Sequence, residues 1–189
     1  MYYFIGGPPT SGKSHLASTF AKDSGLDILH VKTDSLRNNI DNPELKKWVD
    51  FFRDQDEEKY WSNTSPLKHL ENFVKQNTIL WPSLLKEFQR LMDTHKHIIF
   101  EGVSILPNLA RRDLNFDGLY LIPTDIESVY TRLLAHRRWG STEKLKRIEA
   151  EMFFYHETPF FEKAARQYGY PVFADYSEAY NRLGSLFIK

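Results

Sequence analysis

The segment that most constrains this chain is Gly7-Pro8-Pro9-Thr10-Ser11-Gly12-Lys13-Ser14, which fits the pattern Gly-x4-Gly-Lys-Ser. The apolar run 2–5 precedes it, and residues 16–21 repeat apolar side chains at helical spacing. A strand, a loop of this kind and a helix together surround a polyphosphate with backbone N–H groups and the positive end of a helix dipole. We therefore expect a nucleotide-phosphate site at the start of the chain.

Each part of the loop has a distinct expected role. Residues Thr10 to His15 can all donate backbone N–H groups, whereas Pro8 and Pro9 cannot. Lys13 can reach the β- and γ-phosphates, and the Ser14 hydroxyl can ligate Mg²⁺. The expected nucleotide-binding residues are Gly7, Pro8, Pro9, Thr10, Ser11, Gly12, Lys13, Ser14 and His15.

Composition narrows the class of protein. A length of 189 residues suits one domain, 1–189, and 25 basic against 25 acidic residues give no sign of a nucleic-acid or membrane surface. The chain has no cysteine, which excludes disulfides and a cysteine nucleophile, and its 7 histidines show no metal-binding spacing. With no basic-then-apolar leader and no apolar run of about 18 residues, we expect a cytoplasmic protein.

The order of apolar runs predicts the architecture. Strand-like runs occur at 2–5, 28–31, 97–100, 119–122 and 171–173, with helical patterns between them. This alternation predicts an α/β fold, the P-loop NTPase fold, with about five mainly parallel strands and helices on both faces. Residues 84–92 form an apolar helical stripe, and a long charged helix starts near Ser141 with a stripe that includes Tyr155.

The remaining segments are expected to cover the ligand-binding edge of the sheet. Residues 41–78 are rich in charged and aromatic side chains and predict two or three helices, within a helical acceptor-binding insertion over 41–95. Residues 132–160 are expected to form a lid. The many aromatic residues of both segments either line a pocket or fill a core, and core filling is the simpler interpretation.

The other motifs distinguish among the proteins that use such a loop. GTPases usually carry Asp-x-x-Gly after the third strand and Asn-Lys-x-Asp for the guanine base. Neither pattern occurs in this chain. GTPase activity is therefore disfavoured, which leaves ATPases, kinases and nucleotide sensors.

Asp34 and Arg37 follow the second apolar run in Lys32-Thr33-Asp34-Ser35-Leu36-Arg37. A hydroxyl that attacks phosphorus needs a carboxylate within hydrogen-bond reach to take its proton. The pattern Asp34-x-x-Arg37 resembles the signature of small P-loop kinases, including 2-phosphoglycerate kinases, polynucleotide kinases and some antibiotic-modifying kinases. The resemblance implies that Asp34 is the general base and that Arg37 binds the acceptor or the transferring phosphate. A simpler alternative is that Asp34 caps a helix beginning at Ser35.

Glu101 ends the third apolar run, in the segment His97-Ile98-Ile99-Phe100-Glu101-Gly102-Val103-Ser104-Ile105-Leu106-Pro107. This segment resembles the Ile-Glu-Gly-Val-His-Leu-x-Pro run of 2-phosphoglycerate kinases, with Ser104 in place of their histidine, a difference that weakens the transfer of their substrate to this chain. At the end of a strand, Glu101 is expected to position Mg²⁺ or to bind the substrate, which makes Ser14 and Glu101 the expected metal residues. The alternative is a structural pair with a basic side chain.

Three arginines follow an expected Asp125-capped helix in Asp125-Ile126-Glu127-Ser128-Val129-Tyr130-Thr131-Arg132-Leu133-Leu134-Ala135-His136-Arg137-Arg138. Their spacing is similar to that of the lid arginines of nucleoside monophosphate kinases. A guanidinium fork suits phosphoryl oxygens, and a lid over ATP excludes water. Arg132 and Arg137 are the expected catalytic arginines, although the sequence leaves open which of the three reaches phosphate. The alternative is a solvated basic helix end.

Together the motifs predict ATP- and Mg²⁺-dependent transfer of the γ-phosphoryl group to a hydroxyl of a small-molecule acceptor. The resemblance is closest to 2-phosphoglycerate kinase-like, polynucleotide kinase-like and zeta-toxin-like members of the nucleoside monophosphate kinase-like group. One alternative is a kinase of a nucleotide, nucleotide sugar or nucleic-acid end, although the neutral net charge disfavours nucleic acid. Another is an ATP-binding regulatory module without acceptor chemistry, or a protein that only binds nucleotide. The acceptor and the oligomeric state are not predicted.

Overall fold

The computed structural model describes residues 1–136 and 138–187. Its sheet consists of β1 (Tyr2–Gly6), β2 (Leu29–Lys32), β3 (Ile98–Glu101), β4 (Gly118–Leu121) and β5 (Val172–Phe173). The strand order is β2-β3-β1-β4-β5, and every neighbouring pair is parallel. The predicted α/β fold with a five-stranded parallel sheet is confirmed.

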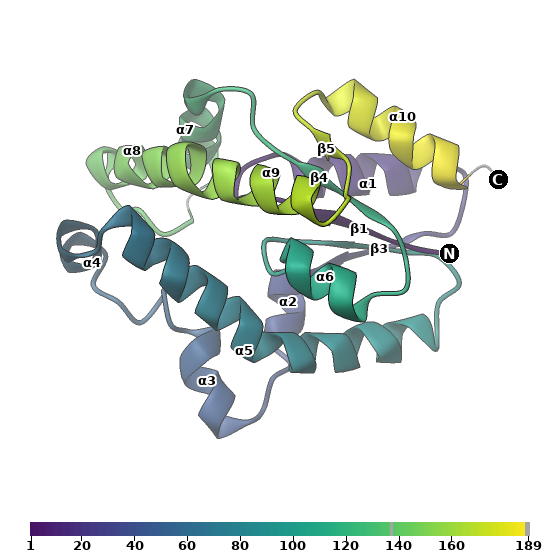
Figure 1. The fold of residues 1–189 in the computed structure, drawn as a ribbon, viewed down its shortest axis with the longest axis horizontal. Coiled ribbons are helices and arrows are strands. Elements are labelled where there is room, and N and C mark those ends of the chain that lie inside the picture. Colours follow the sequence, from purple (N-terminus) through teal and green to yellow (C-terminus); the bar gives the residue numbers. More distant parts are fainter. Residues whose placement is uncertain (137, 188–189) are drawn as a thin grey trace.

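Helices cover both faces of this sheet. One face packs against α1 (Lys13–Asp23) and α10 (Tyr176–Phe187), and the other against α5 (Pro66–Met92), α6 (Pro107–Asp113) and α9 (Thr158–Gln167). Figure 1 shows α1 and α10 above the strands and α5 and α6 below them. Within the described part of the chain, no helix combines the length and apolarity needed to cross a membrane.

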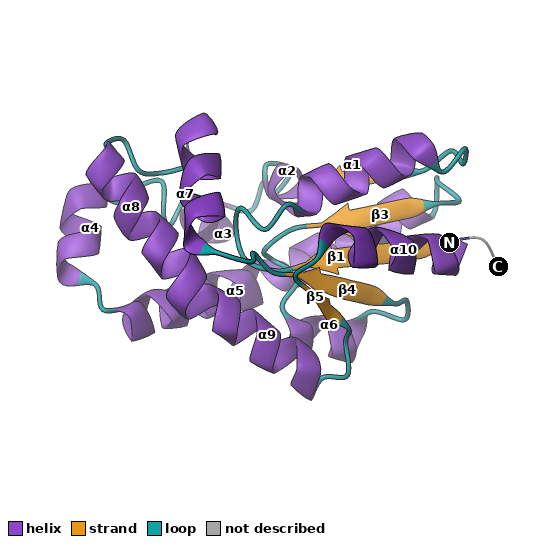
Figure 2. Ribbon diagram, turned by 90° about the horizontal axis from the view of Figure 1, so that it is seen from above, coloured by secondary structure: helices purple, strands orange, loops and turns teal. Residues whose placement is uncertain are grey.

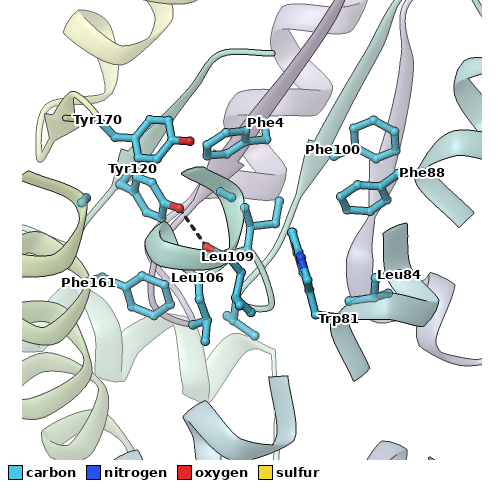
Figure 3. Packing of buried hydrophobic residues seen from close by; sticks show 14 of the residues in the cluster. Phe4, Trp81, Leu84, Phe88, Phe100, Leu106, Leu109, Tyr120, Phe161 and Tyr170 are labelled. Atoms are coloured by element: carbon cyan, nitrogen blue, oxygen red, sulfur yellow. Dashed lines mark hydrogen bonds between the residues drawn. The ribbon is translucent and has the colours of Figure 1, made fainter. Parts of the chain in front are cut away.

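The larger core is aromatic and lies between the sheet and the layer of α5, α6 and α9 (Figure 3). Alternation along β1 directs Phe4 into this core and its neighbours Tyr3 and Ile5 into the core on the α1 face. Phe88 of α5 stacks on Phe100 of β3 with ring centroids 4.1 Å apart. Burial on both faces explains why the strands read as continuous apolar runs in the sequence.

The remaining helices gather at the edge where the strands end. They are α2 (Thr33–Arg37), α3 (Pro43–Val49), α4 (Glu57–Asn63), α7 (Ile126–Ala135), α8 (Glu143–Met152) and the π-helix η1 (Phe153–Glu157). In Figure 2 the strand arrowheads point towards α3, α4, α7 and α8, and both chain ends lie at the opposite side. Ligands of open parallel sheets bind at this carboxyl edge.

The stripe at 84–92 is only the last part of a longer helix than the sequence predicted. The 27-residue α5 begins at Pro66, where the Ser65 side chain accepts the Lys68 N–H and Pro66 occupies the first turn. Pro82 lies inside α5 without ending it. The helix therefore connects the predicted insertion directly to the core of the sheet.

The expected long helix near Ser141 is also divided. Thr142, not Ser141, caps α8, and η1 separates α8 from α9. A π turn contains an extra residue and rotates the positions that follow it. Tyr155, predicted on the apolar stripe, is therefore 56% exposed.

Candidate functional site

The loop between β1 and α1 has a tight backbone with three residues at positive φ. The φ angles are 134° at Gly7, 58° at Thr10 and 97° at Gly12. A Cβ at Gly7 would lie 2.2 Å from the carbonyl oxygen of Leu121, so the loop passes too close to β4 for a side chain. α1 starts at Lys13, and the N–H groups of its first turn have no intrahelical acceptor. The loop and the helix end therefore form a site suited to an anion.

Lys13 folds back on this loop. Its Nζ donates to the Pro8 carbonyl oxygen at 2.6 Å and to Ser11 Oγ at 3.2 Å. Burial lowers the pKa of Lys13 to about 8, and the charge of Glu101 opposes that shift. Pro8 and Ser11 thus serve the site by holding the lysine, whereas Pro9, Thr10, Gly12, Lys13, Ser14 and His15 line the adjoining cavity.

Ser14 and Glu101 meet where β3 ends. Ser14 Oγ donates to Glu101 Oε1 at 2.6 Å, and His30 Nε2 lies 3.5 Å from the same oxygen. Burial would raise the pKa of Glu101, but the neighbouring His30 ring, the charge of Lys13 and the hydrogen bond from Ser14 hold it below its usual value. Glu101 therefore has both a basic neighbour and a contact with the expected metal-binding serine.

This pair fits a magnesium ion better than a transition metal. A hydroxyl and a carboxylate are hard oxygen ligands, and Mg²⁺ usually takes its other ligands from water and substrate phosphates. Among the described residues, no group of three or more His, Cys, Asp or Glu side chains is placed to hold a metal. Ser14 and Glu101 would therefore hold Mg²⁺ only together with a bound polyphosphate.

Asp34 and Arg37 both lie on the short helix α2. Asp34 is exposed, whereas Arg37 is partly buried. Asp34 Oδ2 is 3.7 Å from Arg138 Nη2. Arg37 Nη2 donates to Ser104 Oγ at 2.5 Å and to the Asn77 side chain. Burial lowers the pKa of Arg37, and the charge of Asp34 opposes the shift.

The alternative of Asp34 as a helix cap is wrong. α2 begins at Thr33, so Lys32 occupies the N-cap position and no side chain caps this helix. The Asp34 carboxylate lines the cavity instead.

The arginines after Asp125 approach the loop from the other side. Asp125 caps α7 by accepting the Ser128 N–H at 2.7 Å, as predicted. Arg132 Nη1 donates to the Thr10 carbonyl oxygen at 2.5 Å. Arg138 forms the ion pair with Asp34 and also lines the cavity, and Arg137 lies outside the described residues.

These groups share one cavity of about 770 Å³ at the carboxyl edge of the sheet. Besides the loop residues already named, the predicted catalytic and metal residues that line it are Lys13, Ser14, Asp34, Arg37, Glu101 and Arg132. Its opposite wall comes from the segments expected to form the insertion and the lid. That wall includes Phe52, Trp61, His69, Trp139, Glu149 and Glu157.

Sequence reasoning expected these segments to cover the site but did not identify the residues that line the cavity. Core filling is the simpler interpretation of the aromatic residues in the sequence, yet five of them line the cavity, namely Phe52, Trp61, Phe73, Trp139 and Phe153. His69 is buried and lies within hydrogen-bond distance of Glu157, and it also lines the cavity. No sequence signal pairs these two residues, because they lie 88 positions apart.

The sequence matches no family model, and no curated protein is similar enough to count as a match. A solved structure of shikimate kinase from Acinetobacter baumannii in complex with shikimate is similar, with a TM-score of 0.52 and 12% identity. The similarity covers 99% of this chain and 92% of that one. The chain has the P-loop NTPase fold.

An uncharacterized protein from Eubacterium ventriosum has a TM-score of 0.45 at 15% identity, covering 98% of this chain and 97% of that one. Within the P-loop NTPase fold, the loop after β1 and the five-stranded parallel sheet agree with what the sequence predicted, whereas the strand order was not predicted. The three kinase subgroups named from the motifs stay predictions.

Proposed function

We propose that this protein is a kinase that transfers the γ-phosphoryl group of ATP to a hydroxyl of a small molecule. The observation that carries the proposal is the shared cavity, in which Lys13, Ser14 and Asp34 line the same space. A volume of about 770 Å³ lies within the range of small-molecule sites. The similar shikimate kinase structure, which holds shikimate, supports a small-molecule acceptor.

The residues at the loop would bind and orient ATP. Lys13 and the N–H groups at the start of α1 bind the phosphates, and Arg132 joins the loop to α7. A magnesium ion held by Ser14 and Glu101 would neutralise charge on the phosphates. Much of the rate gain in phosphoryl transfer comes from such positioning and electrostatic stabilisation.

Asp34 is the proposed general base. It takes the proton of the acceptor hydroxyl as the new P–O bond forms and the bond to the ADP oxygen breaks. Its carboxylate is exposed to the cavity and near Arg138, which also places positive charge where negative charge develops. Arg37 is fixed by Asn77 and Ser104 and orients the acceptor beside Asp34.

The first experiment is a phosphotransfer screen with labelled ATP across sugars, glycerates, shikimate, nucleosides, nucleotides and nucleotide sugars. With any acceptor found, Asp34→Asn is expected to reduce transfer at least 100-fold, since general-base catalysis contributes about 10²–10⁴-fold. ATP binding should persist, because Asp34 is not part of the loop. Asp41→Asn, the same change at an exposed position that does not line the cavity, should leave both unchanged.

Two results would contradict the proposal in different ways. Full transfer by Asp34→Asn would eliminate the general-base role. Tight ATP binding with no acceptor raising turnover above background hydrolysis would instead favour an ATP-binding regulatory module.

A further inference from the structure

The wall of the cavity formed by the insertion and the lid contains a buried carboxylate with one unpaired oxygen. Glu157 is 1% exposed, and its Oε1 lies 3.0 Å from His69 Nε2. Its Oε2 is buried without a hydrogen-bond partner. An unpaired buried acceptor is costly, so this oxygen is a ready partner for a ligand that brings a donor.

The hydrogen bonds around His69 are satisfied without a charge on its ring. Asn72 Nδ2 lies 3.4 Å from the Tyr60 hydroxyl oxygen, and that hydroxyl lies 3.1 Å from His69 Nδ1. With the Tyr60 hydrogen directed to Nδ1, a neutral imidazole carries its own hydrogen on Nε2 and donates it to Glu157. Glu157 Oε1 is thus occupied by His69, and Oε2 is left as the free acceptor.

A second carboxylate lies in the same wall. Glu149 is 2% exposed and accepts the Gly140 N–H at 3.2 Å. Burial raises the pKa of Glu149, and the negative charge of Glu157 raises it further. The Gly140 N–H and the charge of Arg138 oppose this rise. Glu149 therefore adds a second buried acidic side chain to the wall that contains Glu157.

Aromatic rings complete this wall. Phe52, Trp61 and Trp139 line the cavity, with ring centroids 5.3 Å apart between Trp61 and Trp139 and 6.1 Å apart between Phe52 and Trp139. Trp61 also packs against His69 at 5.1 Å, which brings the rings and the His69–Glu157 pair together. Rings clustered beside carboxylates attract a cation through their π faces.

We propose that this wall, defined by Phe52, Trp61, Trp139, Glu149 and Glu157, binds a protonated amine on the phosphate acceptor. The acceptor is then a small hydroxyl compound that also carries an ammonium group, of the amino sugar or amino alcohol class. The ammonium lies against the aromatic rings and donates to Glu157 Oε2, while the hydroxyl at the other end of the molecule faces Asp34. The acceptor role rests on the proposed kinase function, whereas binding of the amine does not.

The test uses acceptor pairs that differ only by an amine in place of a hydroxyl, namely glucosamine with glucose and serinol with glycerol. Shikimate serves as an anionic comparison. Binding is measured by calorimetry in the presence of a non-hydrolysable ATP analogue, and phosphotransfer is measured with ATP. In the wild-type protein the amine of each pair should bind at least tenfold more tightly than its hydroxyl partner.

The variant Glu157→Gln keeps the shape of the side chain and removes its charge. It should weaken amine binding about 10–100-fold and hydroxyl binding much less, since a hydrogen bond to a charged group is stronger than a neutral one. Glu151→Gln is the matched control, because Glu151 is exposed on α8 and does not line the cavity. If Glu157→Gln unfolds in a thermal melt, Glu149→Gln should show the same preference loss more weakly.

Equal binding of both members of each pair, or tighter binding of shikimate, would overturn the amine site even if the protein proves to be a kinase. The same preference loss in Glu151→Gln would also overturn it. If amines bind with the expected preference but no acceptor is phosphorylated, the amine site stands and the kinase function fails.

Discussion

Lys13 provides a test of the nucleotide site that needs no knowledge of the acceptor. Burial lowers the pKa of this lysine to about 8 in the unliganded protein. Phosphate binding requires the charged form, and bound polyphosphate raises the pKa again by adding negative charge beside the ammonium group. ATP affinity should therefore fall as the pH rises through about 8.

The size of the effect follows from the fraction of Lys13 that is protonated. With a pKa of about 8, that fraction is about 75% at pH 7.5 and about 3% at pH 9.5. The dissociation constant for ATP should thus rise about 25-fold across this range, or about 1.9 kcal/mol. The terminal phosphate of ATP is almost fully ionised throughout, so it contributes little to the change.

Calorimetric titration of ATP into the protein at a series of pH values measures the curve directly. Lys13→Arg is the control, because a guanidinium stays charged over the whole range. This variant should bind ATP more weakly at every pH but with a flat profile. A flat wild-type profile, or the same slope in Lys13→Arg, would refute the assignment of the titration to Lys13.

Two further predictions concern the stability of the scaffold. Phe88→Ala should lower the free energy of unfolding by about 3–5 kcal/mol in denaturant titrations, because Phe88 is fully buried against Phe100. Lys86→Ala, on the exposed side of α5, is the control and should change the free energy of unfolding by less than about 0.5 kcal/mol. Asp125→Ala should cost about 1 kcal/mol through loss of the bond from the Ser128 N–H, and Asp125→Asn should retain most of that stability. An equal loss of unfolding free energy in Phe88→Ala and Lys86→Ala, or in Asp125→Ala and Asp125→Asn, would contradict the reasoning.

The sequence predicted those structural elements that depend on residues close together in the chain. The loop at Gly7 to Ser14 has a fixed spacing, the strands are continuous apolar runs, and the capping aspartate Asp125 immediately precedes its helix. Parallel pairing then places the ends of β1, β2 and β3 at one edge, which brings Ser14, Asp34 and Glu101 together.

The cavity wall of Phe52, Trp61, Trp139, Glu149 and Glu157 was not predictable in the same way. His69 and Glu157 come from α5 and η1, and their contact depends on how two helices cross far from each other in sequence. The π turn at η1 adds a rotation that a helical periodicity of 3.6 does not contain. Buried polar pairs of this kind are set by tertiary packing, so local patterns carry no sign of them.

The segments expected to form the lid and the insertion are also joined to each other, which bears on how a kinase with this site would limit ATP hydrolysis. Glu57 of α4 accepts the Ser141 N–H at 3.0 Å and also bonds the Ser141 hydroxyl, just before α8 begins. Under the proposed function, the segment 132–157 carries Arg132 beside the phosphate loop and Glu157 in the wall that meets the acceptor. An acceptor that engages this wall thus acts on the same segment that brings Arg132 to the loop. Coupling of this kind would favour phosphoryl transfer over hydrolysis, since a closed lid excludes water when both substrates are bound.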